Sequence, residues 1–319
     1  MSNNEKVKIL KDFLGGYNRT GQEYLFTCPK CKHHKRKLSV NLDKNVFKCW
    51  ICEFKGNNIN RLVRKYADFN LKAKWRELTG QVEIQQFDEI IATLFPDEEE
   101  DTPEVVKLPN EFLSLANKSK SVLSTKARNY LNKRGITDED ILFWKIGYCP
   151  SGEYAGRIIV PSFSESGDCN YFIGRTYQND WRKYMNPPTS KSKIIFNELY
   201  IDWQEDLVLT EGIFDAIVSG KNSVPILGSS LKEQSRLFKS IIRNDTPVYV
   251  ALDPDAEEKA ASLVENLIKY GAEVYKIEVF PYNDVGEMPK KEFQKRKNTA
   301  RLMSSEDAFL QKFISTFDF

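Results

Sequence analysis

The stretch Leu207–Glu287 decides the fold of this chain: LVLTEGIFDAIVSGKNSVPILGSSLKEQSRLFKSIIRNDTPVYVALDPDAEEKAASLVENLIKYGAEVYKIEVFPYNDVGE. Short apolar runs rich in valine and isoleucine predict four β-strands, namely Leu207–Leu209, Val224–Leu227, Val248–Leu252 and Val274–Val279. The segments between these runs space their apolar residues at helical intervals, over Ile213–Ser219, Leu231–Arg243 and Ala256–Tyr270. Such alternation predicts a parallel sheet with crossover helices.

Acidic residues follow these predicted strands at their carboxyl ends. Glu211 follows the first strand, Asp253 and Asp255 follow the third, and Asp284 and Glu287 follow the fourth. Carboxylates that converge there repel one another unless a hard cation lies between them, and Mg²⁺ (or Mn²⁺) suits oxygen ligands. Solvation on the surface would explain any one of these acids, but it would not explain their shared position at strand ends.

The acids also form a motif series: EGxxD from Glu211 to Asp215, then DxD from Asp253 to Asp255, then the late acids. This series resembles the TOPRIM domain of DnaG-type primases and topoisomerases. The resemblance implies catalytic metal ligands at Glu211, Asp253 and Asp255. It extends the Mg²⁺ set to Glu211, Asp215, Asp253, Asp255 and Asp284. Many bacterial members of the family carry a second acid where this chain has Gly286, so the role of Glu287 stays open.

Two C-x2-C pairs lie near the amino terminus. Cys28 and Cys31 are separated by 17 residues from Cys49 and Cys52. Four thiolates at this spacing predict one tetrahedral zinc site, and a site with no open position is structural rather than catalytic. Between the pairs, residues 37–41 and 45–48 predict a short hairpin.

Basic and aromatic residues surround the predicted zinc site. Lys35, Arg36 and Lys37 suit the phosphate backbone of a nucleic acid, and an exposed aromatic such as Trp50 could stack on an unpaired base. Packing in a small core is the alternative; it is preferred for Phe26 and Phe47 and stays open for Trp50. The zinc pairs with the following KGNNINRLVRKYA (residues 55–67) resemble the zinc-binding domain of DnaG-type primases, including those of bacteriophages.

A second resemblance covers residues 126–200, with YLNKRG, GRIIVP, GR and KYMN in that order. These motifs are similar to the basic amino-terminal half of the primase polymerase domain. The resemblance implies contacts with template or nucleotide phosphates from four residues: Arg157, Arg175, Lys183 and Asn186. Arginine offers a planar fork to phosphate, and lysine offers a point charge.

Charge is divided unevenly along the chain. The net charge is +2, but residues 1–70 hold 15 Lys and Arg against 6 Asp and Glu, and residues 201–319 hold 15 against 20. A basic module beside an acidic one predicts that one part binds a polyanion while the other does chemistry. No apolar run is long enough to span a membrane and no signal peptide is recognised, so a cytoplasmic location is expected.

These features predict a multi-domain α/β chain. The expected parts are a zinc ribbon at 1–70, a helical segment with an acidic linker at 71–125, a basic α+β subdomain at 126–205, a TOPRIM parallel sheet at 206–288 and a short helical tail at 289–319. The acids 97–101 define the linker, because a run of like charge repels itself and cannot build a core.

The resemblance implies a stand-alone, phage-type DNA primase. Such an enzyme synthesises short RNA primers from ribonucleoside triphosphates on a single-stranded DNA template for lagging-strand replication, using one structural zinc ion and two magnesium ions. No Walker-type phosphate loop is present, so no helicase engine is expected in this chain. The resemblance implies a replicative helicase as a separate chain. A TOPRIM nuclease and a non-catalytic recombination mediator that binds DNA through zinc and TOPRIM domains are the alternatives.

Overall fold

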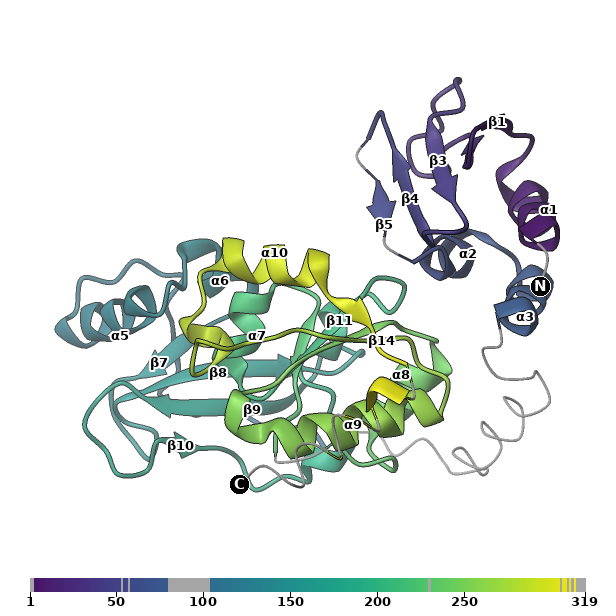
Figure 1. The fold of residues 1–319 in the computed structure, drawn as a ribbon. Helices are drawn as coiled ribbons and strands as arrows, with labels where there is room; N and C mark the ends of the chain where they lie inside the picture. Colours follow the sequence, from purple (N-terminus) through teal and green to yellow (C-terminus); the bar gives the residue numbers. More distant parts are fainter. Residues whose placement is uncertain are drawn as a thin grey trace. The chain divides into compact units, whose positions relative to one another are not determined.

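A computed structural model describes residues 3–52, 54–56, 58–79, 104–228, 231–304, 306–308, 310 and 313. The chain forms two compact units, residues 1–92 and 93–319, and each is described by itself (Figure 1). The acidic run 97–101, predicted to be a linker, lies outside the described residues. No described helix is both long and apolar enough to cross a bilayer.

The first unit is a small antiparallel sheet with helices beside it. The strands β1 (Asn18–Thr20), β2 (Glu23–Phe26), β3 (Leu38–Asn41), β4 (Val46–Cys49) and β5 (Lys55–Gly56) lie in that order in the sheet. The predicted hairpin is confirmed as β3 and β4, in which Leu38 lies opposite Cys49. The helices are α1 (Asn3–Leu14), α2 (Asn60–Tyr66) and α3 (Phe69–Thr79).

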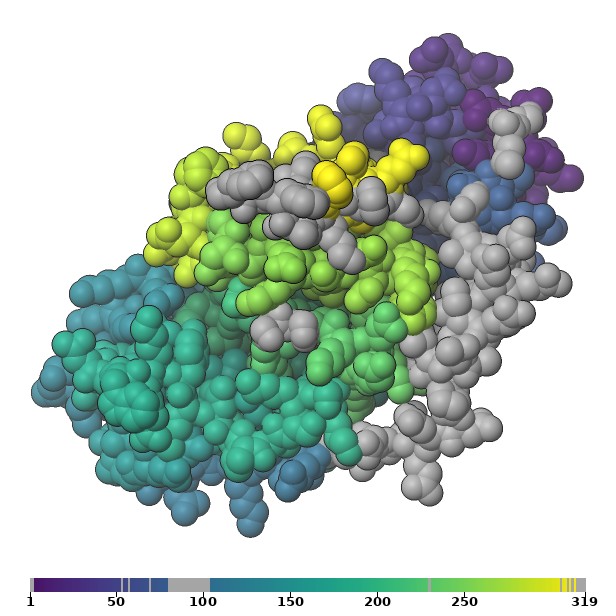
Figure 2. Space-filling model, turned by 60° about the horizontal axis from the view of Figure 1, so that its bottom comes forward, coloured from purple at the N-terminus to yellow at the C-terminus, as the bar shows by residue number. Residues whose placement is uncertain are grey.

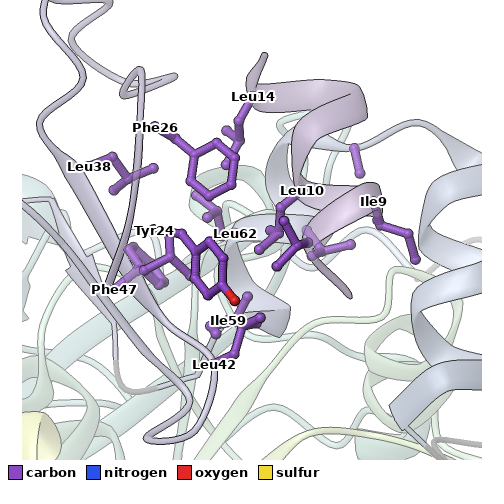
Figure 3. Packing of buried hydrophobic residues seen from close by; sticks show 14 of the residues in the cluster. Ile9, Leu10, Leu14, Tyr24, Phe26, Leu38, Leu42, Phe47, Ile59 and Leu62 are labelled. Carbon is purple, nitrogen blue, oxygen red and sulfur yellow. The ribbon is translucent and has the colours of Figure 1, made fainter. Parts of the chain in front are cut away.

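The core of this unit is shared between the sheet and α1. Figure 3 shows Leu10 and Leu14 of α1 among Phe26 of β2 and Leu62 of α2, and all four side chains are buried. Phe26 and Phe47 are core residues, as expected. The zinc ribbon therefore has an apolar core that reaches well before its first cysteine.

The boundaries between the units differ from those predicted at residues 70 and 125. Trp75 of α3 is buried in the first unit, and its Nε1 donates to Asn60 Oδ1 at 2.6 Å. At the other end, the Val106 N–H donates to the Cys169 carbonyl, and Leu113–Ser114 forms β6 of the second unit. The helical part of the predicted segment 71–125 thus extends the first unit, whereas its residues from 104 onward belong to the second unit. Both assignments depend on contacts with residues distant in sequence.

The first half of the second unit is an antiparallel sheet with two helices. Its strands, in spatial order, are β10 (Tyr184–Met185), β9 (Cys169–Thr176), β8 (Arg157–Phe163), β7 (Gly147–Cys149) and β6. The helices are α5 (Val122–Lys133) and α6 (Asp138–Phe143). Thr137 caps α6: its side chain accepts from the Asp140 N–H. Short 3-10 turns, η1 (Lys191–Lys193) and η2 (Glu198–Tyr200), lead into the second half.

The second half contains the predicted parallel sheet. Its order is β12 (Ser223–Pro225), β11 (Leu207–Thr210), β13 (Val248–Ala251), β14 (Val274–Lys276) and β15 (Arg301–Leu302). The first four strands are parallel, which confirms the alternation seen in sequence. Figure 1 shows α7 (Ile213–Ser219) and α10 (Lys290–Thr299) on one side of this sheet, with α8 (Arg236–Arg243) and α9 (Glu257–Lys269) on the other. The 3-10 turns are η3 (Pro254–Ala256) and η4 (Val285–Glu287).

The carboxyl-terminal segment contains the expected helix, α10, and it also contributes a strand to this sheet. After α10 the chain forms β15, which pairs antiparallel with β14, and the Met303 N–H donates to the Val274 carbonyl. Phe293 of α10 is fully buried against the sheet. Figure 2 shows the tail, in yellow, lying against the green surface of the preceding segment. A two-residue edge strand carries too little periodicity to be predicted from sequence.

We expect α1 to stabilise the zinc ribbon. Replacing the fully buried Leu10 with Ala removes core contacts and costs about 2–5 kcal/mol of unfolding free energy. Leu10→Ala should therefore release zinc faster to a chromophoric chelator than the wild type does. Lys11→Ala, at an exposed position on the same helix, is the matched control. Equal release rates for the two variants would remove α1 from the folding unit.

Candidate metal centres and active site

The four cysteines lie together in the first unit. Their sulfurs are within 4.8 Å of one another; the Cys28 and Cys52 Sγ atoms are 3.8 Å apart, and those of Cys31 and Cys49 are 3.9 Å apart. A tetrahedral zinc site with Zn–S bonds of about 2.3 Å has sulfur–sulfur edges of about 3.8 Å. The spacing of the thiols therefore fits one zinc ion, and four sulfur ligands leave no open position for catalysis.

Burial makes the Cys28 thiol depend on the cation. Desolvation raises the pKa of Cys28 to about 12, so its thiolate would not form at neutral pH without a positive partner. Zinc supplies that charge, and ligand deprotonation then accompanies metal binding. The site is consequently a folding element of a unit whose core is small.

The basic residues around the zinc site face solvent. Lys35, Arg36 and Lys37 are exposed, and Arg36 also donates to Asn18 Oδ1 at 2.7 Å. Trp50 is 61% exposed, so the core alternative for this residue is wrong. The Lys48 ammonium lies 4.6 Å from the centroid of the Trp50 ring. This surface presents positive charge beside an aromatic face, as a single-stranded nucleic acid requires.

The second unit brings three of the predicted acids together at the carboxyl edge of its parallel sheet. Glu211 follows β11, and Asp253 and Asp255 follow β13; one oxygen from each lies within 4.8 Å of the others. The two strands are direct neighbours in register, with Thr210 beside Ala251. Parallel pairing therefore brings acids from distant parts of the sequence to one point.

Asp215 and Asp284 lie outside this group of three. Both Asp215 oxygens accept backbone N–H groups, Oδ2 from Gly212 at 2.9 Å and Oδ1 from Gly286 at 2.8 Å. Asp284 Oδ1 accepts from the Glu287 N–H at 2.7 Å. A Cβ built on Gly286 would lie 3.0 Å from Asp215 Oδ1, so the close approach favours glycine there. Asp215 thus joins the loop after β11 to the loop after β14.

The side chain of Glu287, whose role the sequence left open, points elsewhere in its own loop. Its Oε2 accepts from Asn283 Nδ2 at 2.8 Å. Among the described residues, the three-acid group contains neither Glu287 nor Asp284. Their placement supports a role for the last loop in shaping the site rather than in supplying its first ligands.

The electrostatics of the acids fit a cation. Burial, followed by the charges of Asp215, Glu211, Asp284 and Asp255, raises the pKa of Asp253 to about 7. Burial and then Asp284 raise the pKa of Asp215 to about 6. Asp253 Oδ1 is buried without a hydrogen-bond partner, which is costly unless a ligand satisfies it. Hard oxygen donors of high charge suit Mg²⁺, and the residues therefore fit that ion.

The four residues predicted to contact phosphates have different surroundings. Lys183 is exposed. Arg175 is partly buried: its Nε donates to Tyr130 OH at 3.0 Å, and its guanidinium carbon lies 4.6 Å from the Tyr184 ring centroid. Asn186 Oδ1 accepts from the Gly174 N–H at 3.3 Å. Arg175 lies on β9, and Lys183 and Asn186 lie on either side of β10.

Arg157 differs from the prediction. It is 2% exposed, its Nη2 forms an ion pair with Asp180, and its Nη1 donates to the Arg182 carbonyl at 2.9 Å. Both guanidinium amino groups therefore bind the chain itself. In this structure Arg157 holds the loop before β10 and does not face a phosphate, because its strand β8 lies inside the sheet.

Sequence reasoning missed a cluster that joins the two halves of this unit. The Arg134 guanidinium carbon lies 4.9 Å from the Phe214 ring centroid and 5.1 Å from that of Tyr130. Burial raises the pKa of Tyr184, and the charge of Asp215 raises it further. Arg134 belongs to the YLNKRG motif, which was the available signal, but its position beside the acidic half is a property of the fold. Cationic groups therefore lie next to the carboxylates.

The raised pKa values of these acids should make the stability of the metal-free protein depend on pH. A carboxyl whose folded pKa exceeds its unfolded value of about 3.9 favours folding below that value and loses this contribution as pH rises towards the folded pKa. Without metal, Asp253→Asn should melt near the wild-type temperature at pH 4 and above it at pH 8. Calorimetry in EDTA measures the gap, and added Mg²⁺ should raise the melting temperature of the wild type more than that of the variant. A gap that stays constant from pH 4 to pH 8 would contradict this electrostatic account.

Substitutions of Arg157 and Lys183 should distinguish a cation that stabilises the fold from one that binds nucleic acid at the surface. Arg157→Gln loses two charge-assisted hydrogen bonds and should lower the unfolding free energy by about 2 kcal/mol, measured by urea denaturation. Lys183→Gln should leave stability unchanged and reduce the salt dependence of single-stranded DNA binding by about 0.7 in log–log slope. If Arg157→Gln instead left stability unchanged and reduced the salt dependence of DNA binding, Arg157 would be a phosphate-binding residue.

Comparison with known proteins agrees with this arrangement. Residues 3–92 match the CHC2 zinc finger family, the zinc ribbon of DnaG. The DNA primase of Staphylococcus epidermidis is 24% identical over 86% of this chain and 54% of its own length. That of Thermotoga maritima is 23% identical over 90% and 57%. The chain thus spans about half the length of these curated relatives.

A solved structure shares the fold of the second unit. The DnaG primase catalytic domain bound to single-stranded DNA has a TM-score of 0.53 and 19% identity, covering 73% of this chain and 85% of that one. In this chain an amino-terminal zinc ribbon is followed by an antiparallel sheet and then by a parallel sheet with carboxylates at its edge. The chain is therefore similar to DnaG-type primases, in its zinc ribbon by sequence and in its larger unit by fold.

Proposed function

We propose that this chain is a DNA primase, which joins ribonucleoside triphosphates into a short RNA primer on a single-stranded DNA template. The observation that carries the proposal is the cluster of Glu211, Asp253 and Asp255 at the carboxyl edge of the parallel sheet. Cationic side chains from the antiparallel sheet, including Arg175 and Lys183, lie in the same unit. Anionic ligands for a metal and cations for phosphates are the two requirements of phosphoryl transfer.

The chain's own residues would act by positioning and charge. Glu211, Asp253 and Asp255 would hold magnesium, two ions in all if Asp284 completes the set. Bound magnesium would lower the barrier by neutralising charge on the attacking hydroxyl and the leaving pyrophosphate. Asp215 keeps the loops after β11 and β14 together through Gly212 and Gly286. Because the acids stand on a rigid sheet edge, little reorganisation is needed when substrate arrives.

The antiparallel half would bind the substrates. Arg175 is oriented by Tyr130 and Tyr184, so its guanidinium is held ready for a nucleotide or template phosphate. Lys183 offers a mobile positive charge, and Asn186 fixes the backbone of β9 at Gly174. Arg134, beside Phe214, adds a cation close to the acidic half. These contacts would orient the triphosphate towards the metal ligands.

The zinc ribbon would contribute to template binding. Lys35, Arg36 and Lys37 present charge to the phosphate backbone, and the exposed Trp50 presents a ring to a base. The proposal includes a role for the zinc ribbon in choosing initiation sites. It also includes a replicative helicase as a separate partner chain, action in lagging-strand replication and a cytoplasmic location.

The other two functions have less support. A TOPRIM nuclease would use similar acids, but the zinc ribbon and the basic antiparallel sheet would have no assigned purpose. A non-catalytic recombination mediator would not need the convergence of Glu211, Asp253 and Asp255 with an unpartnered buried carboxylate oxygen. Incubation with single-stranded DNA, four ribonucleotides and magnesium separates the three functions, because the products are primers, cut DNA or neither.

Primer synthesis should depend on Asp253. Asp253→Asn keeps the size of the side chain but removes a charge from the metal site, so we expect primer yield to fall at least about 100-fold. Gel analysis of radiolabelled ribonucleotide incorporation measures the yield, and DNA binding should persist. Asp168→Asn, an exposed acid in the turn between β8 and β9, is the control. Full primer yield from Asp253→Asn would refute the mechanism.

A further inference from the structure

Trp181 has an unusual position for a large aromatic side chain. It is 88% exposed, and no other large hydrophobic side chain among the described residues is more exposed. It stands in the loop between β9 and β10. An isolated exposed tryptophan on a loose loop would need no explanation. This loop, however, is held by an ordered set of hydrogen bonds.

The residues on both sides of Trp181 are anchored to one buried side chain. Arg157 forms an ion pair with Asp180 and donates to the Arg182 carbonyl, and the Arg182 N–H donates to Asp180 Oδ1 at 2.9 Å. The Asp180 N–H donates to the Gln178 carbonyl at 3.0 Å. The backbone at Trp181 is therefore fixed while its ring is left in solvent. Pre-ordering of this kind lowers the entropy lost when the ring binds a ligand.

The surroundings of the ring favour a nucleic acid. The Arg182 guanidinium carbon lies 5.4 Å from the ring centroid, and Lys183 is exposed next along the chain. A surface for another protein would be expected to extend the apolar area, whereas here the neighbouring residues are cationic. Aromatic rings among cations are the elements that bind unpaired bases and their phosphates.

The loop also leads towards the reaction site. Tyr184, three residues after Trp181, faces the Arg175 guanidinium, which donates to Tyr130; the Tyr130 ring in turn packs edge-on against Phe214, the neighbour of Asp215 in sequence. Three residues of chain span no more than about 11 Å. A strand that contacts Trp181 is consequently within a few nucleotides of the acidic edge.

We propose that Trp181 stacks on an unpaired base of the template DNA strand, and that Arg157 is the positioning residue that holds the loop for this contact. The inference rests on the proposed function for the identity of the strand as template. It assigns a binding contact to a residue outside the motifs that indicated the family. Stacking on a base is tolerant of sequence, so the contact would hold the template without selecting its bases.

Binding to oligo(dT) of about 16 nucleotides tests the contact, measured by fluorescence anisotropy of a labelled strand with the full-length, zinc-loaded protein. Trp181→Ala should weaken binding about 5- to 150-fold, the range for loss of one stacked base. Trp181→Phe keeps an aromatic face and should restore most of the affinity. Val122→Ala, an exposed apolar position on α5, should bind as the wild type does.

Two further readouts distinguish stacking from a general loss of structure or charge. The melting temperature of Trp181→Ala should equal that of the wild type, because the ring is exposed. The slope of log affinity against log salt should stay unchanged in Trp181→Ala, whereas Arg182→Gln should reduce it by about 0.7. Quenching of tryptophan emission by the oligonucleotide should be smaller in Trp181→Phe than in the wild type.

Several outcomes would overturn the inference. Unchanged affinity in Trp181→Ala removes the contact, and primer synthesis by the same protein would show that the proposed function survives. Weaker binding of oligo(rU) with unchanged binding of oligo(dT) would assign Trp181 to the primer strand instead. If the wild type makes no primers but Trp181→Ala still lowers DNA affinity, the stacking contact stands and the proposed polymerase activity fails.

Discussion

Repulsion among carboxylates at the edge of the parallel sheet is the constraint on which the second unit depends. Parallel pairing of β11 and β13 brings Glu211 within 4.8 Å of Asp253 and Asp255, and burial leaves Asp253 Oδ1 without a protein partner. The neighbouring Asp215 accepts hydrogen bonds from two backbone N–H groups, which stabilise its negative charge. This helps the fold to tolerate the arrangement. The remaining cost favours a bound cation, so stability of the edge and function of the site are linked.

The first unit has a different dependence on metal. Its sheet strands are short, and the Cys28 thiol is buried enough that its ionised form needs a cation. Zinc therefore contributes to folding directly, while Leu10 and Leu14 of α1 extend the apolar core. A small domain with one metal site gains from any additional helix that it can bury.

Arg157 shows why motif membership and chemical role can differ. Its place in GRIIVP predicted a phosphate contact, but it stands on an inner strand where a guanidinium must find partners within the protein. It finds them on both sides of Trp181, so its charge orders a loop instead of meeting substrate. Arg175, on the next strand, is only partly buried and points its guanidinium at Tyr184.

The sequence alone determined the zinc ligands, the parallel sheet with its helices, and the acids at the strand ends, because each has a local pattern: paired cysteines, alternating apolar runs and short acidic motifs. Tertiary structure decided what depends on distant contacts. It separated Asp215 and Asp284 from the triad, since backbone N–H groups bind their oxygens: Gly212 and the distant Gly286 donate to Asp215, and Glu287 donates to Asp284. It also added α1 to the ribbon core and β15 to the sheet, because burial and edge pairing depend on which surfaces meet after the chain has folded.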